Sequence, residues 1–201
     1  METIASGRGF RLAMNAIAEK ENGGRMENQG MDLNRLGQGT PGITPEFGAC
    51  LAQAAAVCLE EQGHSTGAIM DVDGVFESTF SVLWDRATEQ MKKCWGDVEV
   101  TTEHGAYGVA ILLVINLTEY TIIERSKKGT GFDFWLGHAN DTEPLFQGKA
   151  RLEVSGIRSG NERAISDRVR RKVTQVGMGK SKLPGIIIVE FSGPRSRIMN
   201  K

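Results

Sequence analysis

The sequence predicts a single mixed α/β domain built on a central β-sheet, with a helical addition and a loose arm before it. Three observations favour this class. Apolar residues recur with helical spacing in some segments and alternate in others, as helices and strands require. Hydrophobic residues make up 40% of the 201 residues and charged residues 24%, which is typical of a globular protein and excludes a disordered chain or a coiled coil. The continuous apolar run Ile186–Val189 is typical of a strand covered on both faces.

The N-terminal part divides into two segments. Residues 1–42 are rich in glycine and lack a sustained apolar period, so we expect a flexible arm whose order depends on a partner. Residues 43–100 are predicted to form an addition of helices and a strand. In its first helix, Thr44 is a suitable N-cap, Pro45 fits the first helical position and Gly63 suits the end. The other expected elements of this addition are a strand at Ala68–Gly74 and a helix at Phe80–Trp95.

Residues 101–201 form the predicted α/β core. Its first helix, Glu103–Ile115, is apolar on nearly all sides, so we expect it at the centre of the domain. Gly105 and Gly108 in this helix suit close packing against a sheet. The next expected elements are strands at Tyr120–Arg125, Phe132–Leu136 and Ala150–Gly156, a basic helix capped by Asn161, and a strand at Ile186–Val189.

Two carboxylates fall on neighbouring predicted strands. Asp133 ends the segment Gly131-Phe132-Asp133, and Glu153 begins the segment Glu153-Val154-Ser155. Their separation of twenty residues allows one strand-loop-strand connection, and an antiparallel register then places both on one side of the sheet. With the order helix, three-stranded meander, helix and strand, these motifs resemble the PD-(D/E)XK, or restriction-endonuclease-like, nuclease superfamily. The resemblance covers residues 101–191, about half of the chain, with Ser155 in place of the motif lysine.

This resemblance implies hydrolysis of phosphodiester bonds with Mg²⁺ or Mn²⁺ as cofactor. Because Mg²⁺ prefers carboxylates, carbonyl oxygens and water, the expected ligands are Asp133, Glu153 and the backbone carbonyl of Val154. Such an ion lowers the pKa of a bound water and neutralises charge on the phosphate. Glu103, on the helix before the meander, matches a supporting carboxylate of the family. The alternative is that Glu103 only stabilises the start of its helix through the helix dipole.

The motif lysine stabilises the transition state electrostatically, and the neutral Ser155 cannot supply that positive charge. Lys149, just before the third strand, is the replacement that we expect, acting together with Ser155. The alternatives are Lys128 in the preceding turn, Lys172 on the basic helix and Arg151 on the polar face of the third strand.

The formal net charge of −1 hides an uneven distribution. Residues 146–201 carry 13 Lys and Arg against 4 Asp and Glu, a balance of +9, whereas residues 1–145 have a balance of −10. A basic segment favours binding to a polyanion such as nucleic acid, and the alternative is that the two parts fold together and neutralise each other. Trp135 shares a strand face with Asp133 and either stacks on a base or packs in the core. The expected nucleic-acid contacts are Lys127, Lys128, Arg151, Arg168, Arg171 and Lys172.

We therefore expect a metal-dependent nuclease, with DNA favoured over RNA as its substrate. The alternative is a catalytically silent nuclease-like fold that serves as a nucleic-acid-binding or structural subunit of a bacterial assembly, such as a phage-defence complex. The replaced lysine favours the silent fold, as would ion pairs locking the carboxylates to Arg151 or Arg125. The intact pair Asp133 and Glu153 favours the enzyme.

The remaining expectations concern the surroundings of the protein. No apolar run reaches the roughly 18 residues that a membrane span needs, so we expect no membrane partner. The three cysteines lack metal-ligand spacing and suit apolar core positions in a reducing cytoplasm. We expect a cytoplasmic protein that acts as a homo-oligomer or as a subunit of a larger complex.

Overall fold

The computed structural model describes residues 29–140, 150–176 and 184–200. The strands are β1 (Gln29–Asp32), β2 (Ala68–Gly74), β3 (Ser78–Leu83), β4 (Thr121–Arg125), β5 (Phe134–Gly137), β6 (Ala150–Ile157), β7 (Pro184–Glu190) and β8 (Arg195–Asn200). The helices are the 3-10 helix η2 (Leu33–Gln38) and the α-helices α2 (Pro45–Glu61), α3 (Glu89–Cys94), α4 (Val98–Leu117) and α5 (Glu162–Val176). The described residues thus form a mixed α/β protein, as predicted.

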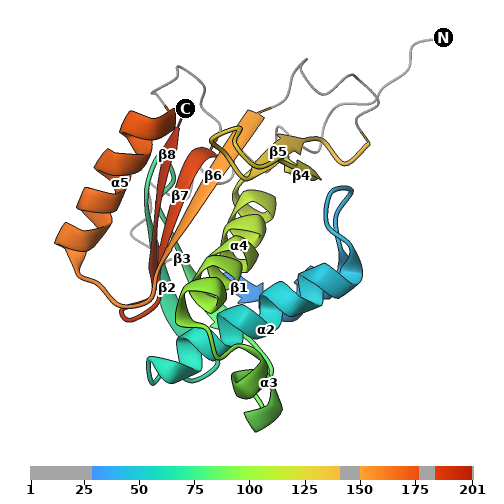
Figure 1. Ribbon diagram of the computed structural model, residues 1–201, viewed down its shortest axis with the longest axis vertical. Coiled ribbons are helices and arrows are strands. Elements are labelled where there is room, and N and C mark those ends of the chain that lie inside the picture. Colours follow the sequence, from blue (N-terminus) through green and yellow to red (C-terminus); the bar gives the residue numbers. More distant parts are fainter. Residues whose placement is uncertain (1–28, 141–149, 177–183, 201) are drawn as a thin grey trace, which may run out of the picture.

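All eight strands belong to one mixed sheet with the order β1-β3-β2-β8-β7-β6-β5-β4. Strands β4, β5 and β6 form an antiparallel meander, and β6 then pairs in parallel with β7. Helices α2 and α4 pack together on one face, whereas α5 covers β6 and β7 on the other face (Figure 1). The predicted order of helix, three strands, helix and strand is confirmed for α4 to β7.

The N-terminal part is more ordered than the sequence suggested. Residues 1–28 lie outside the described residues, but the rest of the expected arm contains β1 and η2. Leu33 and Leu36 of η2 are buried in the main core, so apolar contacts hold this segment against the domain. The predicted cap of α2 is confirmed, because the backbone N–H of Phe47 donates to Thr44 Oγ1 over 3.3 Å.

The prediction of one helix over Phe80–Trp95 is confirmed only for α3 at Glu89–Cys94 and is wrong for the residues before it. The first of those residues belong to strand β3, which pairs antiparallel with β2 and parallel with β1. The segment between β3 and α3 is held by the carboxylate of Glu60, which accepts hydrogen bonds from Trp84 Nε1 and the Ala87 backbone N–H. The apolar residues of β3 and of the loop after it happen to follow the spacing of a helix, which led to the wrong prediction.

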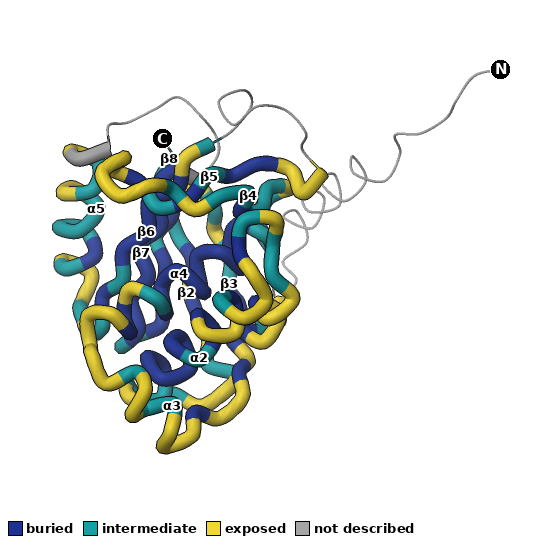
Figure 2. Tube along the Cα trace, turned by 45° about the vertical axis from the view of Figure 1, so that its right-hand side comes forward, coloured by how far each residue is buried: buried dark blue, intermediate teal, exposed yellow. Residues whose placement is uncertain are grey.

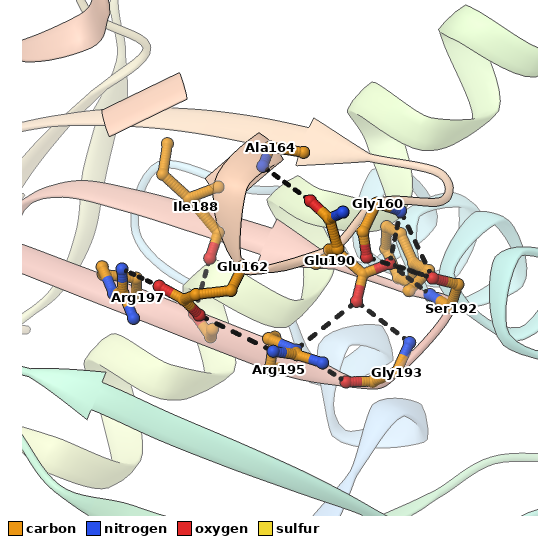
Figure 3. A network of polar contacts seen from close by, with 12 residues as sticks. Gly160, Glu162, Ala164, Ile188, Glu190, Ser192, Gly193, Arg195 and Arg197 are labelled. Carbon is orange, nitrogen blue, oxygen red and sulfur yellow. Dashed lines mark hydrogen bonds and ion pairs between the residues drawn. The ribbon is translucent and has the colours of Figure 1, made fainter. Parts of the chain in front are cut away.

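Strand β8, which the sequence did not reveal, lies between β2 and β7 and joins the two parts of the sheet. The turn before it is built around Glu190, which is fully buried and accepts hydrogen bonds from the backbone N–H groups of Gly160, Ser192 and Gly193 (Figure 3). From β8, Arg197 donates to Glu162 at the start of α5 over 2.6 Å. These contacts fix the position of α5 over the sheet.

Ion pairs also connect the acidic and the basic parts of the chain. Arg197 forms a bidentate pair with Asp73, at 2.6 and 2.7 Å, and Arg158 pairs with Glu61. Part of the positive charge of the C-terminal segment is therefore neutralised within the fold. Such neutralisation was the alternative to the binding of a polyanion.

Helix α4 is the central element, and it is buried along most of its length, as are β6 and β7 (Figure 2). It is long and apolar enough to cross a membrane by length and composition, with a mean hydropathy of 1.3, but 67% of that stretch is buried inside the protein. Gly105 and Gly108 pack against α2 rather than against the sheet. The close approach to the sheet is provided instead by Gly156 of β6, which faces Thr102 of α4.

The three cysteines were expected in the core, but only one of them is buried. Cys58 is buried and its thiol pKa is raised to about 12, chiefly by burial. Cys50 and Cys94 are exposed, and all three are free thiols. The expectation of a core position is therefore wrong for Cys50 and Cys94.

The Gly156→Ala substitution tests the contact between α4 and β6. A Cβ atom at Gly156 would lie 2.5 Å from the carbonyl oxygen of Thr102, so α4 must shift away from the sheet. We expect a loss of about 1–3 kcal/mol in the free energy of unfolding, measured by urea denaturation. Gly37→Ala is the control, because a Cβ there meets no atom within 4 Å. Equal midpoints for the two variants would contradict the packing argument.

Candidate active site

A cavity of about 560 Å³ opens between the N-terminal turns of α4, the second half of β6 and α5. It gathers most of the predicted site into one place, including residues that are far apart in the sequence. The predicted residues that line it are Glu103, Asp133, Glu153, Val154, Ser155, Arg168 and Lys172.

Asp133 lies where β5 and β6 separate. Its backbone N–H donates to the carbonyl of Leu152 over 2.9 Å, and its own carbonyl accepts from Ser126 N–H over 2.7 Å. In a regular strand both groups of one residue point to the same neighbour, so Asp133 departs from strand geometry just before β5 begins. The side chain of Asp133 pairs with β6 two residues beyond Leu152, where Oδ2 accepts a hydrogen bond from the backbone N–H of Val154 over 2.8 Å. A backbone donor thereby fixes the carboxylate of Asp133.

Tyr107 of α4 holds the other oxygen of this carboxylate. Its hydroxyl lies 2.9 Å from Asp133 Oδ1 and 2.6 Å from Oε1 of Glu103, so the single hydroxyl proton stands between two carboxylates. Burial raises the pKa of Tyr107 far above its ordinary value, and the two carboxylates raise it further, so the hydroxyl stays protonated. Tyr107 was not among the site residues predicted from the sequence. The available signal was its spacing of four residues from Glu103, one turn along the same helix.

Glu153 is buried and forms an ion pair with the ammonium group of Lys172 from α5. Of the four cations that were candidates to replace the motif lysine, Lys172 is the one that the structure brings to the carboxylates. Lys149, the expected replacement, lies outside the described residues. Lys128 is exposed in the turn before Asp133 and does not line the cavity.

Ser155 also has a cationic partner on α5. The guanidinium of Arg168 donates to Ser155 Oγ over 2.6 Å and to the carbonyl of Gly156 over 3.3 Å. Its Nε–H is buried and has no hydrogen-bond partner within the described part of the chain. Burial lowers the pKa of Arg168, but a guanidinium remains charged at neutral pH. The short side chain of Ser155 therefore lies next to the positive charge of Arg168.

The two carboxyl groups at the centre influence each other. Burial raises the pKa of Asp133 above its ordinary value, against the opposing effects of Val154 N–H, the Tyr107 hydroxyl and the Lys172 charge. Burial likewise raises the pKa of Glu153, and the Asp133 charge adds to the rise while Lys172 opposes it. Two adjacent carboxylates in a partly buried site repel each other, so a cation between them would stabilise their ionised forms.

The other expected nucleic-acid contacts lie outside the cavity. Lys127 and Lys128 are exposed in the turn before β5, and Arg171 is exposed on α5. Arg151 lies on the face of the sheet that α5 covers and stacks on Phe132 and Trp135. Phe132 was expected to begin the strand predicted at Phe132–Leu136. It lies outside β5 and packs edge-on against Trp135 instead.

The donor set suits a hard divalent cation. Mg²⁺ is usually held by one or two protein carboxylates together with water and phosphate oxygens, and Asp133 and Glu153 supply two such carboxylates. The backbone N–H of Val154 points to the edge of β6 that β5 no longer covers, where it donates to Asp133. In an extended strand the carbonyl of a residue points to the same edge as its N–H, so Val154 O lies on the side of Asp133 as well. Within the described residues no three Asp, Glu, His or Cys side chains converge on one point, so this cation would rely on Val154 O and on solvent or substrate for its other ligands.

The charge of the cavity supports the same conclusion. Its ionisable lining comprises four carboxylates and three cationic groups, a formal balance of −1 when all are ionised. These residues are Glu99, Glu103, Asp133, Glu153, Arg158, Arg168 and Lys172. A bound divalent cation would change the balance to +1, which favours a phosphate anion.

Comparison of the chain with protein-family models, with curated proteins and with solved structures finds no match. The function is therefore inferred from the geometry and chemistry of the cavity.

Asp133→Asn is expected to stabilise the protein at neutral pH. Asparagine can still accept from Val154 N–H and can donate to the Tyr107 oxygen, so the hydrogen bonds remain while the buried charge is removed. The pKa of Asp133 is raised in the folded state, so between the ordinary and the raised pKa the folded protein binds more protons than the unfolded chain. The stability of the parent protein therefore falls as pH rises through that window.

The melting temperature of Asp133→Asn should exceed that of the parent at pH 8, and the difference should shrink towards pH 4. Asp85→Asn, at an exposed position, is the control and should show no such trend. A variant that is less stable than the parent at pH 8 would contradict the assignment of a costly buried charge.

Proposed function

We propose that this protein is a metal-dependent nuclease that hydrolyses phosphodiester bonds, built on a restriction-endonuclease-like core with Asp133 and Glu153 as metal ligands. The observation that carries the proposal is the convergence of these carboxylates and the ammonium of Lys172 in one cavity. The element order from α4 to β7 and the position of Asp133 just before β5 support the resemblance to the PD-(D/E)XK superfamily.

The residues of the cavity divide the chemical work. A divalent ion would supply Lewis acidity, which activates a water and neutralises the scissile phosphate. Lys172 and Arg168 place positive charge where negative charge develops on the phosphate, which lowers the barrier most effectively in a fixed, partly buried site. Tyr107 and Val154 N–H orient the carboxylate of Asp133. Glu103 acts through Tyr107 as a supporting carboxylate.

The alternative of a silent fold has less support from these contacts. Ion pairs that lock the carboxylates to Arg151 or Arg125 would have favoured it. Arg151 instead stacks on Trp135, and Arg125 stacks on Phe47 and Tyr107. The ion pair of Glu153 is with Lys172, a group that the catalytic mechanism requires near the phosphate.

The direct test is incubation of the protein with single- and double-stranded DNA and RNA, in Mg²⁺ or Mn²⁺. We expect metal-dependent cleavage, with DNA preferred, that is lost in the variant carrying Asp133→Ala and Glu153→Ala. Lys172→Met should lower the rate by about 100-fold or more, because one stabilising charge is removed from the transition state. Lys93→Met, at an exposed lysine of α3, is the matched control and should cleave normally.

Failure to cleave any substrate in either metal, with nucleic-acid binding intact and insensitive to Asp133→Ala, would overturn the proposal. It would leave the silent fold as the explanation.

Tyr107→Phe tests the positioning of Asp133. The ring contacts remain, including the edge-on contact with Phe134 at 5.0 Å, so the variant should fold. The rate constant kcat should fall about 10- to 100-fold with little change in KM, because the carboxylate is less well oriented. The Tyr107 hydroxyl lowers the pKa of Asp133, so its loss should also move the acidic limb of the pH–rate profile to higher pH. An unchanged pH profile would indicate a merely structural role.

A further inference from the structure

A stacked group of three side chains lies beside the cavity on the same face of the sheet. Arg151 of β6 is paired across the sheet with Trp135 of β5. The guanidinium carbon of Arg151 lies 5.2 Å from the centroid of the Trp135 ring and 5.3 Å from that of Phe132. The two rings contact each other edge-to-face, at 4.8 Å and 81°. We call Phe132, Trp135 and Arg151 the stacking platform.

The register places this platform next to the carboxylates. Alternate residues of a strand share a face, so Arg151 lies on the same face as Glu153, about 7 Å along β6. Lys172 of α5 contacts Glu153 on that same face. A nucleic acid whose phosphate occupies the cavity would therefore bring an adjacent nucleoside within reach of Arg151.

Arg151 is exposed and keeps its positive charge without a carboxylate partner among the described residues. Arg158, Arg195 and Arg197 pair with carboxylates, whereas no carboxylate lies within 4.0 Å of Arg151 in the described parts of the chain. Arg151 is exposed, while Phe132 beneath it is only 8% exposed. The guanidinium is therefore a cationic plane with a rigid aromatic support, a surface on which unstacked bases are commonly bound.

We propose that the stacking platform is a nucleobase subsite, and that the cavity takes nucleic acid with an unpaired base next to the bound phosphate. This inference rests on the proposed function, because it takes the phosphate to occupy the cavity. In a duplex the faces of each base are covered by its neighbours, so stacking on Arg151 requires a single strand, a frayed end or an extruded base. The substrate class is therefore single-stranded nucleic acid or a junction that offers a single-stranded segment.

The experiment measures binding without cleavage, in EDTA and at one fixed salt concentration. Fluorescence anisotropy compares a labelled single-stranded oligonucleotide with its duplex and with an abasic single strand that keeps every phosphate. We expect the single strand to bind more tightly than either of the other two. Arg151→Lys keeps the charge but removes the planar group, so it should weaken binding of the single strand at least about fivefold. The variant should also lose the difference between the normal and the abasic strand.

Arg125→Lys is the matched control, because Arg125 makes the same kind of stacked contact on the opposite face of the sheet, over Phe47 and Tyr107. It should bind all three ligands as the parent does. Equal binding of the normal and abasic strands by the parent, or an unchanged affinity in Arg151→Lys, would overturn the subsite.

Cleavage is scored separately, so the two proposals can fail independently. Base-dependent binding without cleavage in Mg²⁺ or Mn²⁺ would overturn hydrolysis and support the subsite. Cleavage that is indifferent to the abasic substitution and to Arg151→Lys would support hydrolysis and overturn the subsite.

Discussion

The hydrogen bond from the Val154 backbone to the Asp133 carboxylate is the contact on which the site depends. It forms where the pairing of β5 with β6 ends, so a side chain takes the backbone donor that a continued ladder would have used. The strands can separate there without leaving a buried N–H group unpaired. The separation of β5 from β6 exposes the edge of β6 to the cavity. The hydrogen bond from Val154, with which the contacts between the two strands end, also orients the carboxylate of Asp133.

The two helices that complete the site are held by contacts that have no catalytic role. Gly156 lets α4 approach β6 closely enough for Tyr107 to reach Asp133. The buried carboxylate of Glu190 organises the turn after β7, and Arg197 ties the neighbouring strand to the start of α5 (Figure 3). The cavity therefore depends on described elements that do not line it, including β8, which the sequence did not reveal.

Periodicity and spacing predicted the core elements and the pair Asp133 and Glu153, because strand alternation and a short connection are local properties of the sequence. They failed at Phe80–Trp95, where residues buried by β3 and by the following loop coincided with a helical stripe. Tyr107 was not identified, and Lys172 was only one of several candidate cations, since each reaches the site by packing its helix on the sheet. Such contacts between distant segments leave no regular spacing in the sequence.

Ser155, which the resemblance places where the superfamily has a lysine, illustrates the same distinction between position in the sequence and position in space. Transition-state stabilisation requires a positive charge close to the position where negative charge develops. It does not matter which segment of the chain supplies that charge. A helix lying over the strand can bring a cation to the site from above, as α5 does with Lys172 and Arg168. The hydroxyl of Ser155 accepts a hydrogen bond from Arg168 and so helps to hold one of these cations in place. The serine is therefore compatible with an active site whose cations come from the helix.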